Sequence, residues 1–134
     1  MIEDLFQKIK RSKRVYILGN GGSYANAMHI CNDLLAHGIK AFTIDPATLS
    51  AFANDYGWEV ALERWVRAVG EPGDLLIAMS GSGMSKNILN AIHGAQVIGM
   101  DVYKIFGNER HECMDTLEES QLSIVHVLKG LLKP

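Results

Sequence analysis

A glycine-rich turn between an apolar run and a helical run constrains the fold of this chain more than any other feature. Residues 14–18 (RVYIL) are apolar and partly β-branched, residues 19–23 read GNGGS, and a helical pattern follows as far as Gly38. The order strand, turn, helix brings free backbone N–H groups and the positive end of a helix to the carboxyl edge of a parallel sheet. The sequence therefore predicts an anion site here, with phosphate as the expected ligand.

A second turn of the same kind follows another predicted strand. Residues 74–79 (DLLIAM) form an apolar run, residues 80–85 read SGSGMS, and a helical pattern covers residues 85–98. Glycine and serine also occur in ordinary turns and helix caps, which is the alternative explanation. Two such turns, each directly after a strand, favour binding and indicate that phosphate is held from two sides.

The rest of the chain alternates predicted strands and helices. We expect further strands over residues 40–44 and 101–106, a turn at 54–57, and further helices over 2–12, 47–52, 58–69 and from 114 onward. Alternating strands and helices joined by short turns predict an α/β fold, a small doubly wound parallel sheet of about four strands with helices on both faces. A chain of 134 residues is expected to form one domain over 1–134.

Composition excludes several classes of function. The formal net charge is −2 and the pI is about 6.2, so the basic face typical of nucleic-acid-binding proteins is not expected. No apolar run approaches the roughly 20 residues that span a bilayer, and no basic segment precedes an apolar one at the start. Cys31 and Cys113 are too few for a disulfide framework and are expected to be buried thiols. We therefore expect a cytoplasmic protein that binds neither nucleic acid nor membrane.

A histidine and an aspartate lie four residues apart on the helix that follows the first turn. This spacing places His29 and Asp33 on one helical face, one turn apart. Imidazole nitrogen and carboxylate oxygen both bind zinc, at roughly 2.0 to 2.2 Å. The pair is therefore a candidate half of a metal site, and an ion pair on an exposed helix face is the alternative.

Several motifs, in this order and spacing, resemble the sugar isomerase (SIS) domain family. They are GNGGS with AMH at 27–29, NDYG at 54–57, VGEPGD at 69–74 and SGSG at 80–83. The resemblance runs from about residue 15 to the C-terminus. It implies an SIS-type fold, zinc at the active site, and homotetramers with active sites at subunit boundaries. It also implies interconversion of a ketose phosphate and its aldose phosphate through an enediolate, with sedoheptulose 7-phosphate and glycero-manno-heptose 7-phosphate as the expected pair.

The resemblance assigns site residues position by position. The implied substrate-binding residues are Asn20, Gly21, Ser23, Asn54, Asp55, Ser80, Ser82, Ser85 and Asp115. The implied ligands of one zinc ion per subunit are His29, Asp33, Glu118 and His126. Among these, the resemblance makes Asp33 the base and His126 the acid of the proton transfer.

Some positions depart from the family pattern. Asp33 stands where the family has a glutamate, Glu118 where it has a glutamine, and Gly81 where it has a threonine. Aspartate is one methylene shorter than glutamate, and a base set back by about 1 Å can cost about a hundredfold in rate. The N-terminal helical region is also shorter than in the family, and one sheet strand before the last helix is missing.

The spacing of Glu118 and His126 bears on assembly. Eight residues of straight helix rise about 12 Å, so these two side chains cannot reach a single ion. If both bind metal, they serve different sites, and the last helix of one subunit completes the site of a neighbour. The alternatives are a solvated charge at a helix N-terminus for Glu118 and a hydrogen-bonded core histidine for His126.

Two other functions remain open from the sequence. The exchanged ligand positions and the shortened chain favour a non-catalytic SIS module that binds a phosphosugar and senses it or regulates a partner. A third alternative is an assembly subunit whose turns bind nothing. Turnover of a sugar phosphate separates the first alternative from an enzyme, and thermal stabilisation by sugar phosphates separates the second from both.

Overall fold

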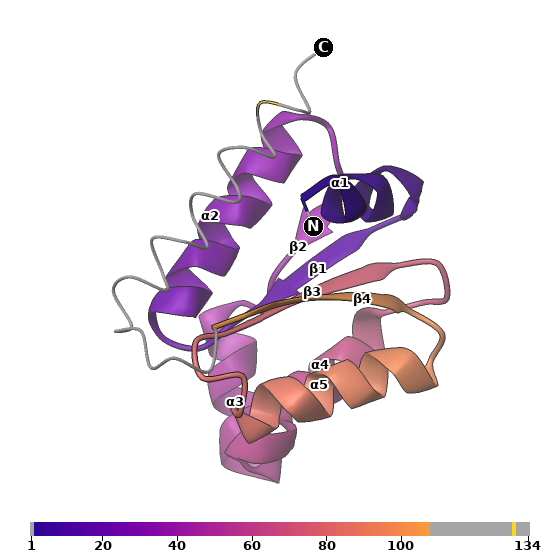
Figure 1. Cartoon of the computed structure of the whole chain (residues 1–134). Helices are drawn as coiled ribbons and strands as arrows, with labels where there is room; N and C mark the ends of the chain where they lie inside the picture. Colours follow the sequence, from indigo (N-terminus) through magenta and orange to yellow (C-terminus); the bar gives the residue numbers. More distant parts are fainter. Residues whose placement is uncertain (1, 108–129, 131–134) are drawn as a thin grey trace.

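A parallel β-sheet with helices on both faces forms the centre of the protein (Figure 1). The computed structural model describes residues 2–107 and Gly130. Within these residues four strands pair in parallel in the order β2-β1-β3-β4. Their bounds are β1 Val15–Leu18, β2 Ala41–Phe42, β3 Leu75–Ser80 and β4 Asp101–Phe106. The predicted α/β fold with a small parallel sheet is confirmed.

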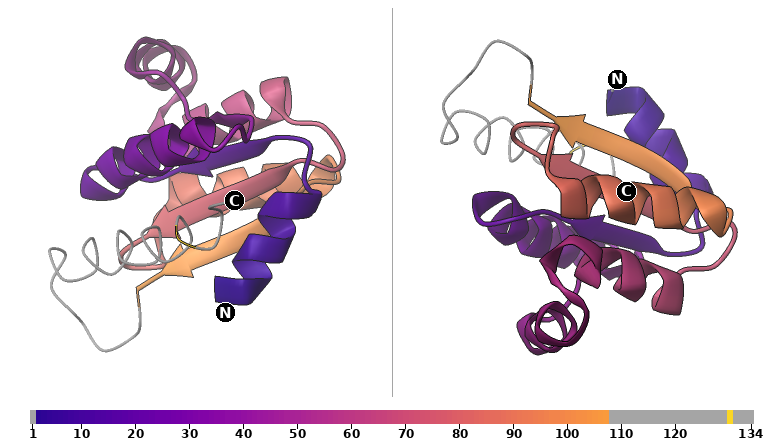
Figure 2. Two further views of the ribbon diagram at one scale, coloured as in Figure 1. Left: turned by 90° about the horizontal axis from the view of Figure 1, so that it is seen from above. Right: turned by 90° about the horizontal axis from the view of Figure 1, so that it is seen from below.

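Helices cover the sheet in two layers. The described part of the chain contains α1 Ile2–Arg11, α2 Gly22–Ala36, α3 Pro46–Tyr56, α4 Trp58–Val69 and α5 Lys86–Val97. Helices α1 and α2 lie on one face of the sheet, α4 and α5 lie on the other, and α3 packs beside α4 (Figures 1 and 2). Both faces of the sheet are therefore covered, as predicted for a doubly wound fold.

The side chains of β1 show why the strand needs cover on both faces. Val15 and Ile17 pack in the core under α1 and α2, whereas Tyr16 and Leu18 pack in the core under α4 and α5. All four are buried. Successive side chains of a strand point to opposite faces, so a strand buried on both sides reads as a continuous apolar run. The same alternation holds along β3.

The edge strand β2 is shorter than predicted. The sequence predicts a strand over residues 40–44, but ladder pairing with β1 covers only Ala41–Phe42. After Phe42, a side chain rather than the backbone bonds to β1: the Thr43 hydroxyl donates a hydrogen bond to the Ile17 carbonyl at 2.6 Å. A hydroxyl bond of this kind lets the chain leave the sheet towards α3.

Helix α3 is longer than predicted. Its first turn is capped by Asp45, whose carboxylate accepts a hydrogen bond from Thr48 N at 2.9 Å. The helix continues through Asn54 and Asp55, which were expected in a turn, and ends at Gly57. Asparagine and aspartate are common in turns, but local propensity is a weak guide, and here the helix continues through them as far as the glycine.

Residues 108–129 and 131–134 lie outside the described structure. The helix predicted from residue 114 and almost all of the polar segment before it fall there. A single domain over 1–134 therefore stays a prediction. Within the described residues, no helix is both long enough and apolar enough to cross a bilayer.

Helix α1 is fixed to the far edge of the sheet by two ion pairs. Lys8 Nζ and Arg11 Nη2 lie 2.8 Å and 2.9 Å from the two carboxylate oxygens of Asp101, at the start of β4. Burial acts to raise the pKa of Asp101, but hydrogen bonds from Lys8, Arg11 and the Val102 N–H outweigh it and hold the pKa below its ordinary value. The ionised carboxylate therefore stabilises the folded state.

Replacing Asp101 with asparagine is expected to lower the free energy of unfolding at pH 7 by about 0.5 to 1 kcal/mol, because partly exposed ion pairs contribute about that much. The folded pKa lies below the unfolded value near 4, so the contribution is complete above about pH 4 and is lost as pH falls through the folded pKa. Urea denaturation at pH 7 and at pH 3 measures the difference.

The control is Glu71→Gln, which removes a longer and more exposed pair with Arg14, 3.6 Å apart. We expect it to change stability much less than Asp101→Asn at pH 7. An effect of Asp101→Asn that is equally large at both pH values would contradict the assignment to the ionised carboxylate.

Candidate functional site

The first turn holds its shape through backbone hydrogen bonds and two glycines. The Asn20 carbonyl accepts hydrogen bonds from Ser23 N (2.9 Å) and Tyr24 N (3.3 Å). A Cβ on Gly19 would lie 2.7 Å from the Ser23 carbonyl group. Gly21 has φ 55° and ψ −121°, a conformation that glycine alone adopts readily. These two glycines let the chain pass from β1 into α2 through a very short connection.

In the second turn, serine hydroxyls accept hydrogen bonds from backbone N–H groups of the same turn. Ser80 Oγ accepts a hydrogen bond from Gly83 N (3.0 Å) and lies 3.2 Å from Ser85 Oγ. Ser82 Oγ accepts from Met84 N (3.1 Å). Ser80 is buried, whereas Ser82 is exposed and Ser85 is half-buried. Ser80 therefore shapes the turn, and Ser82 and Ser85 have hydroxyls that a ligand can reach.

The two turns meet around one small cavity. Its volume is about 90 Å³. The described residues that line it are Asn20, Ser23, Met79, Ser80, Gly81, Ser82 and Ser85. The structure thus brings together five of the predicted substrate residues, from segments 60 residues apart in the chain. Their role in binding stays a prediction.

Two helices begin at this cavity without a side-chain cap. Within the described chain, α2 starts after Gly21, which has no side chain, and Ser85 makes no side-chain capping bond at the start of α5. Neither helix has an acidic residue in its first turn. A helix start without a cap has a partial positive charge that favours an anion. Ser23 N and Tyr24 N already donate to the Asn20 carbonyl, and Ile88 N donates to Asn87 Oδ1. The first-turn N–H groups without such a partner in the described structure are those of Gly22, Lys86 and Asn87. Both the partial charges and the donors therefore favour a phosphate in the cavity.

A row of polar side chains begins at the cavity and extends along one side of α2. Ser23, Asn26, His29 and Asp33 are spaced by three, three and four residues, which places them along one side of the helix. Ser23, Asn26 and Asp33 are at most 8% exposed. The His29 side chain is 48% exposed. The face that bears His29 is therefore open to a ligand, and the carboxylate beside it is largely protected from water.

His29 and Asp33 have the separation that a shared metal ion requires. His29 Nε2 lies 3.4 Å from Asp33 Oδ2. Two ligands bound tetrahedrally to zinc at roughly 2.0 to 2.2 Å lie about 3.3 to 3.6 Å from each other. Among the described residues, no third histidine, cysteine, aspartate or glutamate joins them. The pair fits two of the four predicted ligands, while Glu118 and His126 lie outside the described residues.

Asn54 and Asp55 lie elsewhere on the described structure. Both are exposed at the end of α3, where Asn54 Nδ2 donates a hydrogen bond to Asp55 Oδ1 at 3.2 Å. Neither is among the described residues that line the cavity between the turns. Asp115, the remaining predicted substrate residue, lies outside the described residues.

Sequence reasoning missed two buried asparagines at the site. Asn26 lies between Ser23 and His29 on α2, and Asn87 lies in the first turn of α5, where its side chain is hydrogen-bonded to Asn20. A signal was present for Asn87, because it shares a helical face with Ala91 and Gly94, both buried, where apolar residues are usual.

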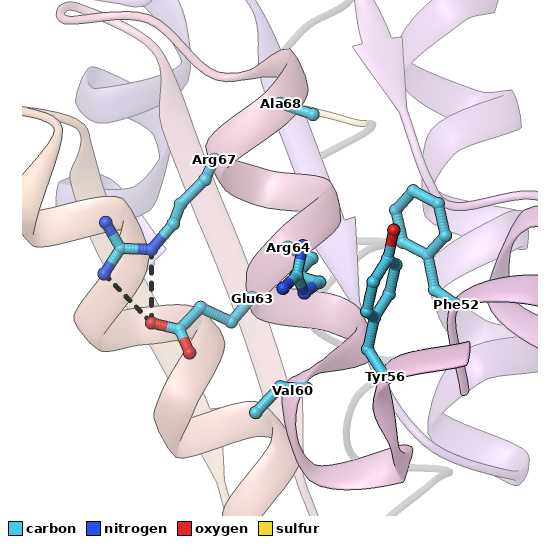
Figure 3. Close-up of a pocket in the computed structure, with 7 residues that line it drawn as sticks. All are labelled: Phe52, Tyr56, Val60, Glu63, Arg64, Arg67 and Ala68. Atoms are coloured by element: carbon cyan, nitrogen blue, oxygen red, sulfur yellow. Dashed lines mark hydrogen bonds and ion pairs between the residues drawn. The ribbon is translucent and has the colours of Figure 1, made fainter. Parts of the chain in front are cut away.

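A larger groove lies between α3 and α4 (Figure 3). Its volume is about 550 Å³, and its charged side chains already have partners. Arg67 forms an ion pair with Glu63 at 3.0 Å, and the Arg64 guanidinium lies 3.7 Å from the centre of the Tyr56 ring. No predicted site residue lines this groove within the described structure. The smaller cavity between the turns is therefore the candidate functional site.

Comparison with known proteins shows the family to which the chain belongs. Residues 1–107 match the SIS domain. The chain belongs to the SIS domain family. This SIS chain is 40% identical to a phosphoheptose isomerase of Sodalis glossinidius and 32% identical to one of Glaesserella parasuis, over 99% of the chain and 78% and 79% of those proteins. The resemblance inferred from the motifs is confirmed.

A solved structure extends the likeness to three dimensions. The phosphoheptose isomerase from Neisseria gonorrhoeae superposes on this SIS domain with a TM-score of 0.89 at 25% sequence identity. The match covers 98% of this chain and 82% of that chain. The SIS-type fold predicted from the sequence is thereby confirmed.

The backbone of Gly21 provides a test of the turn. Gly21→Ala is expected to destabilise the protein by about 1 to 3 kcal/mol, because alanine is strained at this φ and ψ. The neighbouring Gly22→Ala is the control, since Gly22 lies in the first turn of α2, where alanine is favoured over glycine. Thermal denaturation measures both variants. Equal melting temperatures for the two would contradict the role assigned to Gly21.

Proposed function

We propose that this chain interconverts sedoheptulose 7-phosphate and glycero-manno-heptose 7-phosphate, with assistance from a bound zinc ion. Its relatives are named phosphoheptose isomerase, and the chain is a sugar-phosphate isomerase. The observation that carries the proposal is the cavity where both turns and two uncapped helix starts meet. We further propose the cytoplasm as its compartment, in keeping with the free, buried thiol of Cys31.

The phosphate group is proposed to bind in the cavity between the turns. The N–H groups of Gly22, at the start of α2, and of Lys86 and Asn87, at the start of α5, donate to its oxygens, and the partial positive charges of both helix starts attract its negative charge. Ser82 and Ser85 add hydroxyl donors from the second turn. Gly81, in place of the family's threonine, removes one side chain from this contact and leaves the backbone N–H.

The position of His29 suits a seven-carbon substrate. His29 follows Ser23 by six residues, a rise of about 9 Å along α2. An extended seven-carbon sugar phosphate has its reacting carbons about 10 Å from phosphorus, given carbon–carbon bonds near 1.5 Å. A phosphate held at the start of α2 therefore brings the carbonyl end of the sugar to the level of His29 and Asp33.

Isomerisation requires a proton to move between two neighbouring carbons. We assign Asp33 as the base that removes a proton from C1 of the ketose and returns it to C2. His126 is proposed to move the hydroxyl proton between O1 and O2. His29, 3.4 Å from the Asp33 carboxylate, holds it in position. The low exposure of Asp33 limits competing proton exchange with water.

Zinc is proposed to bind at His29 and Asp33. Their separation matches two ligands of one tetrahedral ion, and Glu118 and His126 from two different subunits are proposed to supply the other ligands. When bound, zinc supplies positive charge beside the sugar oxygens, where negative charge develops.

We propose a homotetramer with active sites at subunit boundaries. Asn54 and Asp55 are exposed and do not line the described cavity of their own chain. Such residues are available to complete the site of a neighbouring subunit, and the spacing of Glu118 and His126 along the predicted last helix supports the same arrangement.

A non-catalytic phosphosugar-binding module is the second candidate function. Asp33 favours a module without catalysis. Its carboxylate is one methylene shorter than that of the family's glutamate, and Asp33 is one of the buried residues of α2. Such a module would bind the sugar phosphate through the same cavity and leave it unchanged.

Turnover distinguishes the two functions. Purified protein supplied with zinc is expected to convert sedoheptulose 7-phosphate to the aldose, and Asp33→Asn is expected to lower kcat by about a hundredfold or more, because it removes the base while keeping the shape. Product formation is measured by chromatography. Binding of the sugar phosphate without conversion by the wild type would establish the non-catalytic module instead.

Metal content tests the zinc site. The purified protein is expected to contain about one zinc per subunit, and His29→Ala is expected to lose most of it, because the variant lacks the imidazole nitrogen that binds the ion. The control is His93→Ala, at an exposed position on α5. Elemental analysis measures zinc in all three proteins. Equal zinc in the His29→Ala variant would contradict the site.

A further inference from the structure

Two asparagine side chains connect the turns that form the candidate site. Asn20 Nδ2 donates a hydrogen bond to Asn87 Oδ1 at 2.9 Å, and Asn87 Nδ2 donates one to Asn20 Oδ1 at 2.8 Å. Asn20 lies in the first turn and Asn87 lies at the start of α5, 67 residues further along the chain. The pair therefore ties the turn after β1 to the helix that follows the second turn.

Only one of the two asparagines lines the cavity. Asn20 is half-buried and is among the lining residues, whereas Asn87 is 2% exposed and is not one of the described lining residues. Asn87 thus contacts the site through Asn20. Burying a polar side chain in a core helix is costly unless its hydrogen bonds are made. The bonds to Asn20 and to the backbone meet that requirement.

The backbone of α5 determines which way both amides face. Asn87 Oδ1 also accepts a hydrogen bond from Ile88 N at 3.0 Å. If the Asn87 amide were turned over, its NH₂ group would face that N–H donor. The oxygen of Asn87 is therefore held towards Ile88 N, and its NH₂ group must donate to the Asn20 oxygen. The orientation of the Asn20 amide follows from that of Asn87.

This arrangement leaves defined groups of Asn20 for a ligand. A side-chain amide has two N–H donors and two acceptor lone pairs. The pair uses one donor and one acceptor of Asn20. The second Nδ2 hydrogen remains, in an orientation set by Asn87, on a residue that lines the cavity.

We propose that Asn87 is a positioning residue for the isomerisation: it holds the Asn20 amide ready to donate a hydrogen bond to a sugar oxygen beside the phosphate. The inference rests on the proposed function, because it assigns the donor to a sugar phosphate. Asn87 itself touches no substrate.

Asn87→Asp tests the role directly. The variant keeps an oxygen for Ile88 N but replaces the NH₂ group with a second oxygen, which faces Asn20 Oδ1 and forces the Asn20 amide to turn. We expect kcat/KM for sedoheptulose 7-phosphate to fall about ten- to a hundredfold, since small displacements of a positioning group cost that much. Asn90→Asp, on the same helix with its Nδ2 bonded to the Glu59 carbonyl, is the matched control and is expected to retain activity.

A double-mutant cycle separates positioning from general stability. If Asn87 acts through Asn20, then Asn87→Asp lowers kcat/KM by a much smaller factor in an Asn20→Ala background than in the wild type, and the factor that remains is the effect of the added carboxylate near the phosphate. A residue that only stabilises the fold lowers it by the same factor in both backgrounds. Additive effects, or an active Asn87→Asp single variant, would overturn the inference.

An inactive wild type would overturn the proposed function rather than the pairing. In that event the side-chain amide signals of Asn20 decide, measured by NMR in wild type and Asn87→Asp. Slowed hydrogen exchange of the Asn20 amide in the wild type, lost in the variant, would keep Asn87 as the group that orients Asn20. Equal exchange in both proteins would overturn that as well.

Discussion

The parallel pairing of β1 with β3 is the constraint on which the site depends. Val15 pairs with Leu75 and Leu18 pairs with Ala78, so the two strands end at nearly the same level of the sheet. Each strand is followed at once by a glycine- and serine-rich turn and then a helix. Because both turns leave the same edge of the sheet from neighbouring strands, they must meet. A shift in this register would separate them along the strand direction and open the cavity.

The two helix starts at the cavity lack side-chain caps, as the proposed phosphate site requires. A side-chain cap is worth about 0.5 to 2 kcal/mol to a helix. Helix α3, which begins away from the cavity, has one in Asp45, whereas α2 and α5 begin without. A carboxylate at either start would compete with phosphate for the same N–H groups. A net charge of −2 for the whole chain therefore says little about what this site attracts.

Local pattern predicted the sheet, most of the helices and the pairing of the turns, because each depends on periodicity and turn chemistry within a short segment. The predicted length of β2 and the predicted end of α3 were wrong by a few residues, because tertiary contacts rather than local propensity determine the conformation at Thr43 and Asn54. The bond between Asn20 and Asn87 joins residues 67 apart and no local pattern contains it. The separation of Asn54 and Asp55 from the cavity is likewise a property of the packed chain.

The buried polar side chains of α2 indicate that this helix does more than cover the sheet. A helix that only covered a sheet would carry apolar residues at buried positions, as α2 does at Ile30 and Leu34. Ser23, Asn26 and Asp33 are also buried, and a polar side chain at a buried position contributes less to stability than an apolar one of similar size. The three residues share one side of the helix, begin at the cavity and end beside His29. Packing alone does not account for polar groups in that order, whereas the proposed binding of a phosphate at one end and a sugar carbonyl at the other does.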